Sequence, residues 1–296
     1  MAGLALVLAG GGLAGIAWET GFLLGLADEN PDAAAELRGA ALLLGTSAGS
    51  TVAAQLSSGV PLPELFERQL SPHHHEIAPD GAPQRMSVMF ADVATAPGVT
   101  TAQRLQRVGT AAVAARTVDA PQRRAVIESR LPSHRWPERA LAIPAIDVES
   151  GATVVFDRES GVDLVDAVAA SCAVPGVWPP VTIAGRRYMD GGVATSTNLQ
   201  LARGYDRVVV LTPSPDPAPY LFGGSLADDV ATFPPGTVFV AYADTASVAA
   251  FGRGPLDPAC RPPAALAGRE QGRRQAADVA TFLSVPRPTH GAAQAS

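Results

Sequence analysis

The sequence of 296 residues contains no lysine, and all of its 22 basic residues are arginine. Its 28 acidic residues outnumber them, so the formal net charge is −6. A chain with this charge lacks the overall basic surface that binding to nucleic acid requires. We therefore expect no nucleic-acid partner.

Cysteine is nearly absent, with only Cys172 and Cys260 in the chain. Two cysteines cannot form a disulfide framework and do not have the spacing of a zinc site, which suits a reducing compartment. The consecutive histidines 73–75 are expected in a solvated loop, because adjacent rings project in different directions and no partner cluster stands nearby. We expect no metal site, and we interpret Cys172 as a small buried packing residue.

The sequence also lacks an apolar run of about 18 residues, the length that a membrane span requires. Its apolar start, residues 1–15, has no basic leader and is interrupted by three glycines, so we interpret it as a strand and a turn and not as an export signal. The expected localisation is therefore cytoplasmic. A content of 47% hydrophobic and 17% charged residues is typical of a compact globular domain.

Two strand-turn-helix units open the chain. Residues 3–9 form an apolar run that ends in glycines and precedes a helix-compatible pattern over 14–27. Residues 40–44 form a second apolar run, followed by a second helix-compatible segment over 50–56. This repetition predicts a mostly parallel sheet with helices on both faces, and ligands at the carboxyl ends of its strands.

Sheet-like sequence returns after residue 140. The patterns predict strands over 141–148, 153–156, 181–189, 208–211 and 238–242, with a hairpin turn at 149–151 and helices over 163–172 and 264–283. We expect one domain over 1–285 and a loose tail over 286–296.

Residues 60–139 differ from the rest, since they are rich in proline and contain no obvious buried strand. We interpret them as a helical cap or insertion. Between Arg104 and Arg139 there are eight arginines and three acidic residues, a local balance of +5. These arginines form either a solvated helix face or a basic rim that contacts anionic lipid head groups of a membrane.

A candidate nucleophile follows the second apolar run. Gly45-Thr46-Ser47-Ala48-Gly49 fits G-x-S-x-G, in which small flanking residues permit a strained turn that exposes the serine oxygen. The alternative is that Ser47 only caps the next helix.

The first turn contains Gly10, Gly11 and Gly12, followed by Leu13-Ala14-Gly15. Its backbone N–H groups at a helix N-terminus suit a phosphate or the oxyanion of acyl transfer. The spacing also fits a dinucleotide-binding turn, but that function needs an acidic residue at the end of the second strand, where Ser47 stands instead.

Asp190-Gly191-Gly192 places a carboxylate at the end of a predicted strand. Alone, this is an ordinary turn. Taken with the two glycine motifs and with Ala170-Ser171-Cys172-Ala173-Val174-Pro175, which occur in the same order, the sequence resembles the patatin-like phospholipase family from residue 4 to about residue 207.

The resemblance implies a three-layer α/β/α fold with a mostly parallel central sheet and a helical cap. It implies a serine acyl-ester hydrolase that acts on lipid or other esters without a cofactor, with Ser47 as nucleophile and Asp190 as base. The oxyanion hole would be the N–H groups of Gly10, Gly11 and Gly12, and the remaining motif glycines would support the turns: Gly15, Gly45, Gly49, Gly191 and Gly192.

The sequence departs from the family at Ala14, where the family usually has Arg or Lys. A positive charge that could help the oxyanion or an anionic head group is thus missing, which motivates an alternative function as a weakly active or inactive lipid-binding or regulatory protein. A Ser-Asp-His triad would need His290, which lies in the predicted tail and is poorly placed for a preorganised base. Trp18 and Glu19 are expected to be a packing residue and a surface residue.

Overall fold

A mixed sheet forms the middle of the molecule, in a computed structural model that describes residues 3–79, 90, 93 and 98–285. The strands in these residues are β1 (Leu4–Leu8), β2 (Leu42–Gly45), β3 (Ala140–Asp147), β4 (Thr153–Phe156), β5 (Val181–Ile183), β6 (Arg186–Asp190), β7 (Arg207–Thr212) and β8 (Val238–Tyr242). Their order is β5-β6-β3-β2-β1-β7-β8, and β4 pairs with β3 outside this path. From β3 to β8 the neighbours are parallel, whereas β4, β5 and β6 are added by antiparallel pairing.

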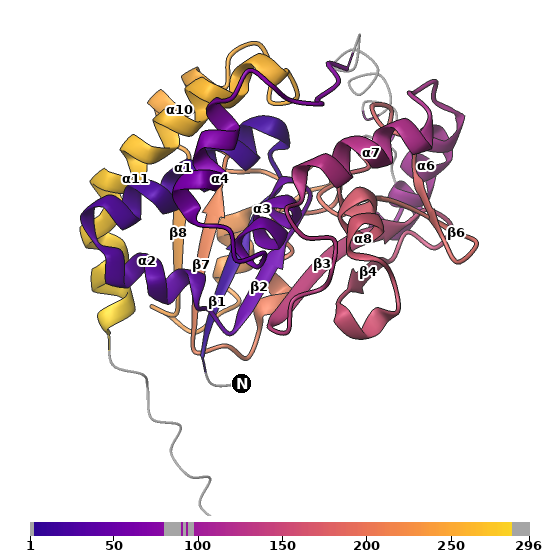
Figure 1. Cartoon of the computed structure of the whole chain (residues 1–296). Coiled ribbons are helices and arrows are strands. Elements are labelled where there is room, and N and C mark those ends of the chain that lie inside the picture. Colours follow the sequence, from indigo (N-terminus) through magenta and orange to yellow (C-terminus); the bar gives the residue numbers. More distant parts are fainter. Residues whose placement is uncertain (1–2, 80–89, 91–92, 94–97, 286–296) are drawn as a thin grey trace, which may run out of the picture.

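Helices cover the sheet on both faces. They are α1 (Gly12–Glu29), α2 (Pro31–Arg38), α3 (Ala48–Leu56), α4 (Leu62–Leu70), α6 (Thr101–Ala114), α7 (Ala120–Arg130), α8 (Leu164–Ser171), α9 (Leu226–Val230), α10 (Thr245–Ala250) and α11 (Arg261–Ser284). Short 3-10 helices are η1 (Arg158–Ser160), η2 (Leu199–Ala202) and η3 (Pro258–Cys260). Figure 1 shows α1, α2, α4 and α11 gathered on one side of the strands.

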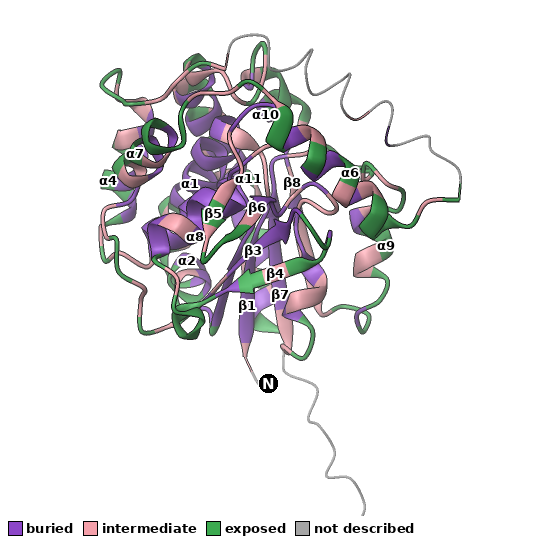
Figure 2. Ribbon diagram, turned by 90° about the vertical axis from the view of Figure 1, so that its right-hand side faces the viewer, coloured by how far each residue is buried: buried purple, intermediate pink, exposed green. Residues whose placement is uncertain are grey.

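The core alternates along each central strand, as a sheet that is covered on both faces requires. Leu4, Leu6 and Leu8 of β1 pack in the larger cluster with α1, α3, α8 and α11, whereas Ala5 and Val7 face a smaller cluster under η2 and α9. The central strands are accordingly buried along their length (Figure 2). The predicted α/β architecture with a three-layer arrangement is confirmed.

Both strand-turn-helix units are present, and the predicted strand over 153–156 has the same bounds as β4. The expected single strand over 181–189 is wrong, because Ala184 and Gly185 both have positive φ, 49° and 78°, and turn the chain into the β5–β6 hairpin. Two successive residues with positive φ match the twist of a tight hairpin. In the described part of 60–139 the regular elements are the helices α4, α6 and α7, and the predicted tail lies outside the described residues.

Helix α1 is buried on all sides from Leu13 to Leu26, and Glu19 lies within this stretch. This residue is 0% exposed, so its expected place on the surface is wrong. Burial raises the pKa of its carboxyl well above the ordinary value. None of the described helices has the combination of length and apolar character that crossing a membrane demands.

The packing of α1 against α11 depends on glycine at the contact. A Cβ atom on Gly21 would lie 2.1 Å from the Ala265 carbonyl oxygen, and one on Gly25 would lie 1.9 Å from that of Arg269. On α11, a Cβ on Gly268 would lie 2.3 Å from the Trp18 carbonyl oxygen. The two backbones therefore touch, and nothing larger than glycine fits between them.

We expect Gly25→Ala to destabilise the protein although alanine favours a helix. The added methyl group meets backbone and cannot be accommodated by a side-chain movement, so the free energy of unfolding should fall by about 1–3 kcal/mol. Gly254→Ala is the control, because a Cβ there meets nothing within 4 Å. Urea unfolding of both variants measures the difference, and equal stabilities would show that the helices separate without cost.

Candidate active site

The sheet topology brings Ser47 and Asp190 to the same place. Ser47 follows β2, which runs parallel to β3, and Asp190 ends β6, which runs antiparallel on the other side of β3. Because β3 extends past the end of β2, Asp190 pairs with Ala145, just beyond the residues that β2 covers. Two side chains that are 143 positions apart in sequence thus flank one strand.

Ser47 lies in a strained turn. Its φ is 52° and its ψ is −114°, in a region that a residue with a Cβ atom rarely occupies. Neighbouring glycines permit the turn, since a Cβ on Gly49 would lie 2.0 Å from the Leu8 carbonyl oxygen. The geometry is that of a nucleophile turn between a strand and a helix.

The Ser47 hydroxyl donates a hydrogen bond to Asp190, with an Oγ–Oδ2 distance of 2.7 Å. Ser47 is 7% and Asp190 4% exposed. The other carboxylate oxygen accepts the N–H of Gly192 at 2.7 Å. Burial raises the pKa of Asp190 to about 6, against the lowering effects of the Ser47 and Gly192 hydrogen bonds and of the Arg123 charge.

The glycine turn offers fewer free donors than expected. The N–H of Gly10 donates to the Ser196 carbonyl oxygen at 2.8 Å, so the expectation that it belongs to an oxyanion hole does not hold. For the N–H groups of Gly11 and Gly12, no acceptor is found within the described residues. Gly12 has a φ of 63° and borders the same cavity as Ser47.

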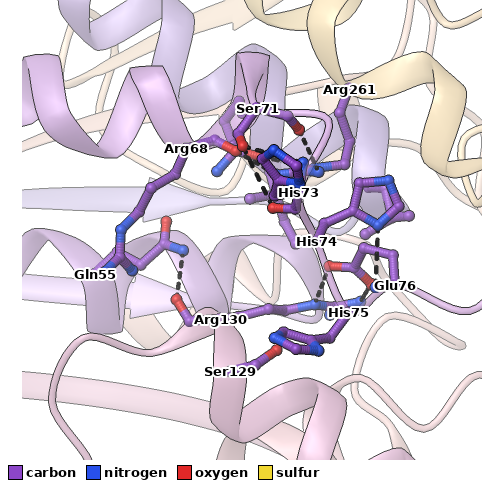
Figure 3. Close-up of a pocket in the computed structure, with 13 residues that line it drawn as sticks. Gln55, Arg68, Ser71, His73, His74, His75, Glu76, Ser129, Arg130 and Arg261 are labelled. Atoms are coloured by element: carbon purple, nitrogen blue, oxygen red, sulfur yellow. Dashed lines mark hydrogen bonds and ion pairs between the residues drawn. The ribbon is translucent and has the colours of Figure 1, made fainter.

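Two of the cavities near this constellation share lining residues. The first, of about 20 Å³, touches Ser47, and a space of that size holds about one water molecule. The second measures about 210 Å³ and shares Leu13, Ile16 and Arg130 with the first. Figure 3 shows the second cavity with the Arg130–Glu76 ion pair, Arg261 and the three histidines around it.

Two arginines of the insertion point into the first cavity. Arg123 and Arg130 are seven residues apart on one face of α7, and both line the cavity with Ser47. By contrast, Arg124 is on another face and pairs with Asp166 at 2.6 Å. The interpretation of the basic segment as a uniformly solvated face is therefore wrong for Arg123 and Arg130.

Three further side chains hold the site, and none of them was predicted as a site residue. Ser171 accepts the N–H of Ser47 at 2.9 Å and donates to the Pro144 carbonyl oxygen at 2.7 Å. Cys172, which is buried as expected, donates its S–H to the Ser47 carbonyl oxygen at 3.2 Å. Asn198 donates to Thr46 Oγ1 at 3.1 Å. Of the three, only Ser171 and Cys172 could have been found from the sequence, because they lie in the segment that resembles a family motif.

The remaining candidates are less informative. Histidines 73–75 are exposed, as expected of a loop. Within the described ranges, no cluster of three or more His, Cys, Asp or Glu side chains has the arrangement of metal ligands. His290 lies outside the described residues.

Replacing Ser171 tests how the turn is held. In Ser171→Ala the buried N–H of Ser47 loses its acceptor, which should lower the free energy of unfolding by about 1–3 kcal/mol. The orientation of the Ser47 hydroxyl should loosen as well, so any reaction at Ser47 should slow. The exposed Ser160→Ala is the control for unfolding and for reaction rate. A fully stable Ser171→Ala variant would show that the turn does not depend on this bond.

A family model described as patatin-like phospholipase matches residues 6–203. Similar solved structures include VipD from Legionella pneumophila, at 12% identity over 93% of this chain and 67% of that one, with a TM-score of 0.47. The type III effector protein ExoU is 16% identical over 93% of this chain and 53% of that one, with a TM-score of 0.43. The chain thus spans about half the length of ExoU.

These structural similarities are too weak to carry an argument about function. A search among curated proteins found no match. The family model covers well over half of the chain, and its span includes the glycine turn, Ser47 and Asp190. The chain therefore belongs to the patatin-like phospholipase family.

Proposed function

We propose that the protein is a serine acyl-ester hydrolase that acts on lipid esters through Ser47 and Asp190. Family membership supports lipid acyl hydrolysis in general. The observation that supports the two residues is their 2.7 Å hydrogen bond in a site removed from water. The Ser47 hydroxyl bonds the Asp190 carboxylate directly, without a histidine side chain in between, so the pair would act as a dyad.

In the proposed reaction, Asp190 accepts the Ser47 proton while Oγ attacks the ester carbonyl carbon. The N–H groups of Gly11 and Gly12 are the donors available for the oxyanion of the tetrahedral intermediate. When the intermediate collapses, the carbon–oxygen bond to the alcohol breaks, and the proton on Asp190 passes to the leaving oxygen. Water then hydrolyses the acyl-enzyme by the same proton transfers in turn.

The environment of Asp190 suits a general base at neutral pH. An exposed aspartate with a pKa of about 3.9 is a weak base. Burial raises the pKa of Asp190 to about 6, so the carboxylate is mostly ionised at neutral pH and is more basic than an exposed one. The hydrogen bond from Ser47 directs this basicity at the nucleophile.

The two cavities indicate how an ester would enter. The space at Ser47 is too small for an acyl chain, whereas the neighbouring cavity of about 210 Å³ is large enough for a small polar group. Leu13, Ile16 and Arg130 separate them, so we expect these side chains to move when substrate binds. Contact with a membrane through the arginine-rich insertion remains a prediction.

The small cavity at Ser47 also favours the second candidate function, a lipid-binding protein with little catalysis. The two functions differ in the reactivity of Ser47. A fluorophosphonate probe that labels Ser47 supports the hydrolase, whereas binding to phospholipid vesicles without labelling supports the alternative.

Substitution of the dyad tests the hydrolase directly. Ser47→Ala should abolish hydrolysis of p-nitrophenyl esters and of phospholipids, since no nucleophile remains. Asp190→Asn should reduce the rate by about 10²–10⁴-fold, the usual contribution of a general base. Ser57→Ala, at the other end of α3, is the control that should retain full rate. Wild-type rates in either dyad variant, with the fold intact by circular dichroism, would contradict the proposal.

The pH dependence has a defined sign. Only the ionised carboxylate accepts a proton, so kcat/KM should rise with pH through about 6, the pKa of Asp190, and then stay level. An acid limb near pH 4, as an exposed aspartate would give, would show that Asp190 is not the group that limits the rate. The rates are measured on a neutral p-nitrophenyl ester, because such a substrate does not ionise and so does not contribute to the pH profile.

A further inference from the structure

A buried arginine of the insertion lies beside the dyad with part of its charge unsatisfied. Arg123 is 5% exposed, and its guanidinium carbon lies 3.9 Å from the ring centroid of Trp178. Its Nη1 atom is buried and has no hydrogen-bond partner in the part of the chain that the structure describes. Burying a cation without a hydrogen-bonded partner is costly, so the position calls for an explanation other than stability.

The charged and titratable groups around Arg123 come from several elements. Arg130, on the same helix, repels it, while Glu76 and Asp190 attract it and Cys172 lies nearby. Glu76 is committed to Arg130, to which it is joined by two hydrogen bonds of 2.9 and 2.7 Å. Asp190 is the other carboxylate that attracts Arg123, and it has no ion pair of its own among the described residues.

Arg123 also shares the small cavity with Ser47 and Gly12. Its cationic side chain thus borders the space in which an ester carbonyl would meet the nucleophile. Burial and the charge of Arg130 lower the pKa of Arg123, but a guanidinium stays protonated at neutral pH.

The first glycine motif lacks a positive charge of its own. Ala14 stands where a basic residue is usual, is fully buried, and donates its N–H to the Pro255 carbonyl oxygen at 3.0 Å. The helix that follows has no basic side chain along its length. A cation must therefore come from elsewhere in the fold.

We propose that Arg123 supplies the positive charge of the active site in place of a basic residue at position 14, and that it stabilises the negative charge that passes from Asp190 to the substrate oxygen. This inference rests on the proposed function. During the attack one negative charge leaves the carboxylate as it is protonated, and one appears on the carbonyl oxygen. A fixed cation lowers the barrier when it stabilises the charge on the carbonyl oxygen more than the charge on the carboxylate, and it does so without rearranging.

The experiment compares three variants by the rate at which a fluorophosphonate labels Ser47, measured across the pH range around the Asp190 pKa. Arg123→Met removes the charge and keeps much of the bulk, while Arg123→Lys keeps the charge. Arg124→Met is the matched control, because Arg124 is the next residue on α7 and pairs with Asp166 away from the cavity. Thermal unfolding of each variant reports on the fold.

Arg123→Met should be labelled about 10- to 100-fold more slowly, within the range of losing one oxyanion donor or somewhat less. Its acid limb should move to higher pH, because the loss of a nearby cation raises the pKa of Asp190. Arg123→Lys should keep the limb near the wild-type position, and Arg124→Met should match wild type in rate and limb. If Arg123 only supported the fold, the acid limbs of the Arg123→Lys and Arg123→Met profiles would lie at the same pH.

Unchanged rate and limb in Arg123→Met would overturn the inference and leave the proposed function standing. If the Met variant does not fold, Arg123→Lys decides, since a limb shifted upward in spite of the retained charge would also overturn it. Failure of wild-type Ser47 to react at any pH would instead overturn the proposed function, and the inference with it.

Discussion

The hydrogen bond between Ser47 and Asp190 is the interaction on which the rest of the site depends. It joins residues at the ends of two strands that are not neighbours, β2 and β6, which pair with β3 on its two sides. The antiparallel β5–β6 hairpin places Asp190 opposite Ala145, close to the turn that follows β2.

Keeping this bond short and shielded from water has a cost in stability. Ser47 holds a backbone conformation that costs of the order of 1–3 kcal/mol, and Asp190 is ionised at neutral pH although burial opposes its charge. Hydrogen bonds to the Ser171 hydroxyl, from the Cys172 thiol and from the Gly192 backbone N–H offset part of that cost. Such strain persists only where surrounding structure fixes it, and here two separate segments do so.

Sequence patterns predicted what is local and missed what depends on distant contacts. Apolar runs that end in glycine identified the strand-turn-helix units, and motif order identified Ser47 and Asp190 as candidates. The hairpin within 181–189 was missed because the residue with the first positive φ is Ala184, an amino acid that gives no turn signal. The bond from Gly10 to Ser196 and the burial of Glu19 depend on segments far along the chain, which periodicity does not register.

The positive charge of the site also depends on contacts between segments that are distant in sequence. The residues of the site come from two different parts of the fold. The nucleophile, its carboxylate partner and the glycine turn all come from the sheet and its first loops, whereas Arg123 and Arg130 come from α7 in the insertion. Arg123 is held by stacking on Trp178, and Arg130 by Glu76, so the placement of both cations depends on packing outside the dyad. Changes in that packing would alter the electrostatics around Asp190 while leaving its hydrogen bond to Ser47 in place.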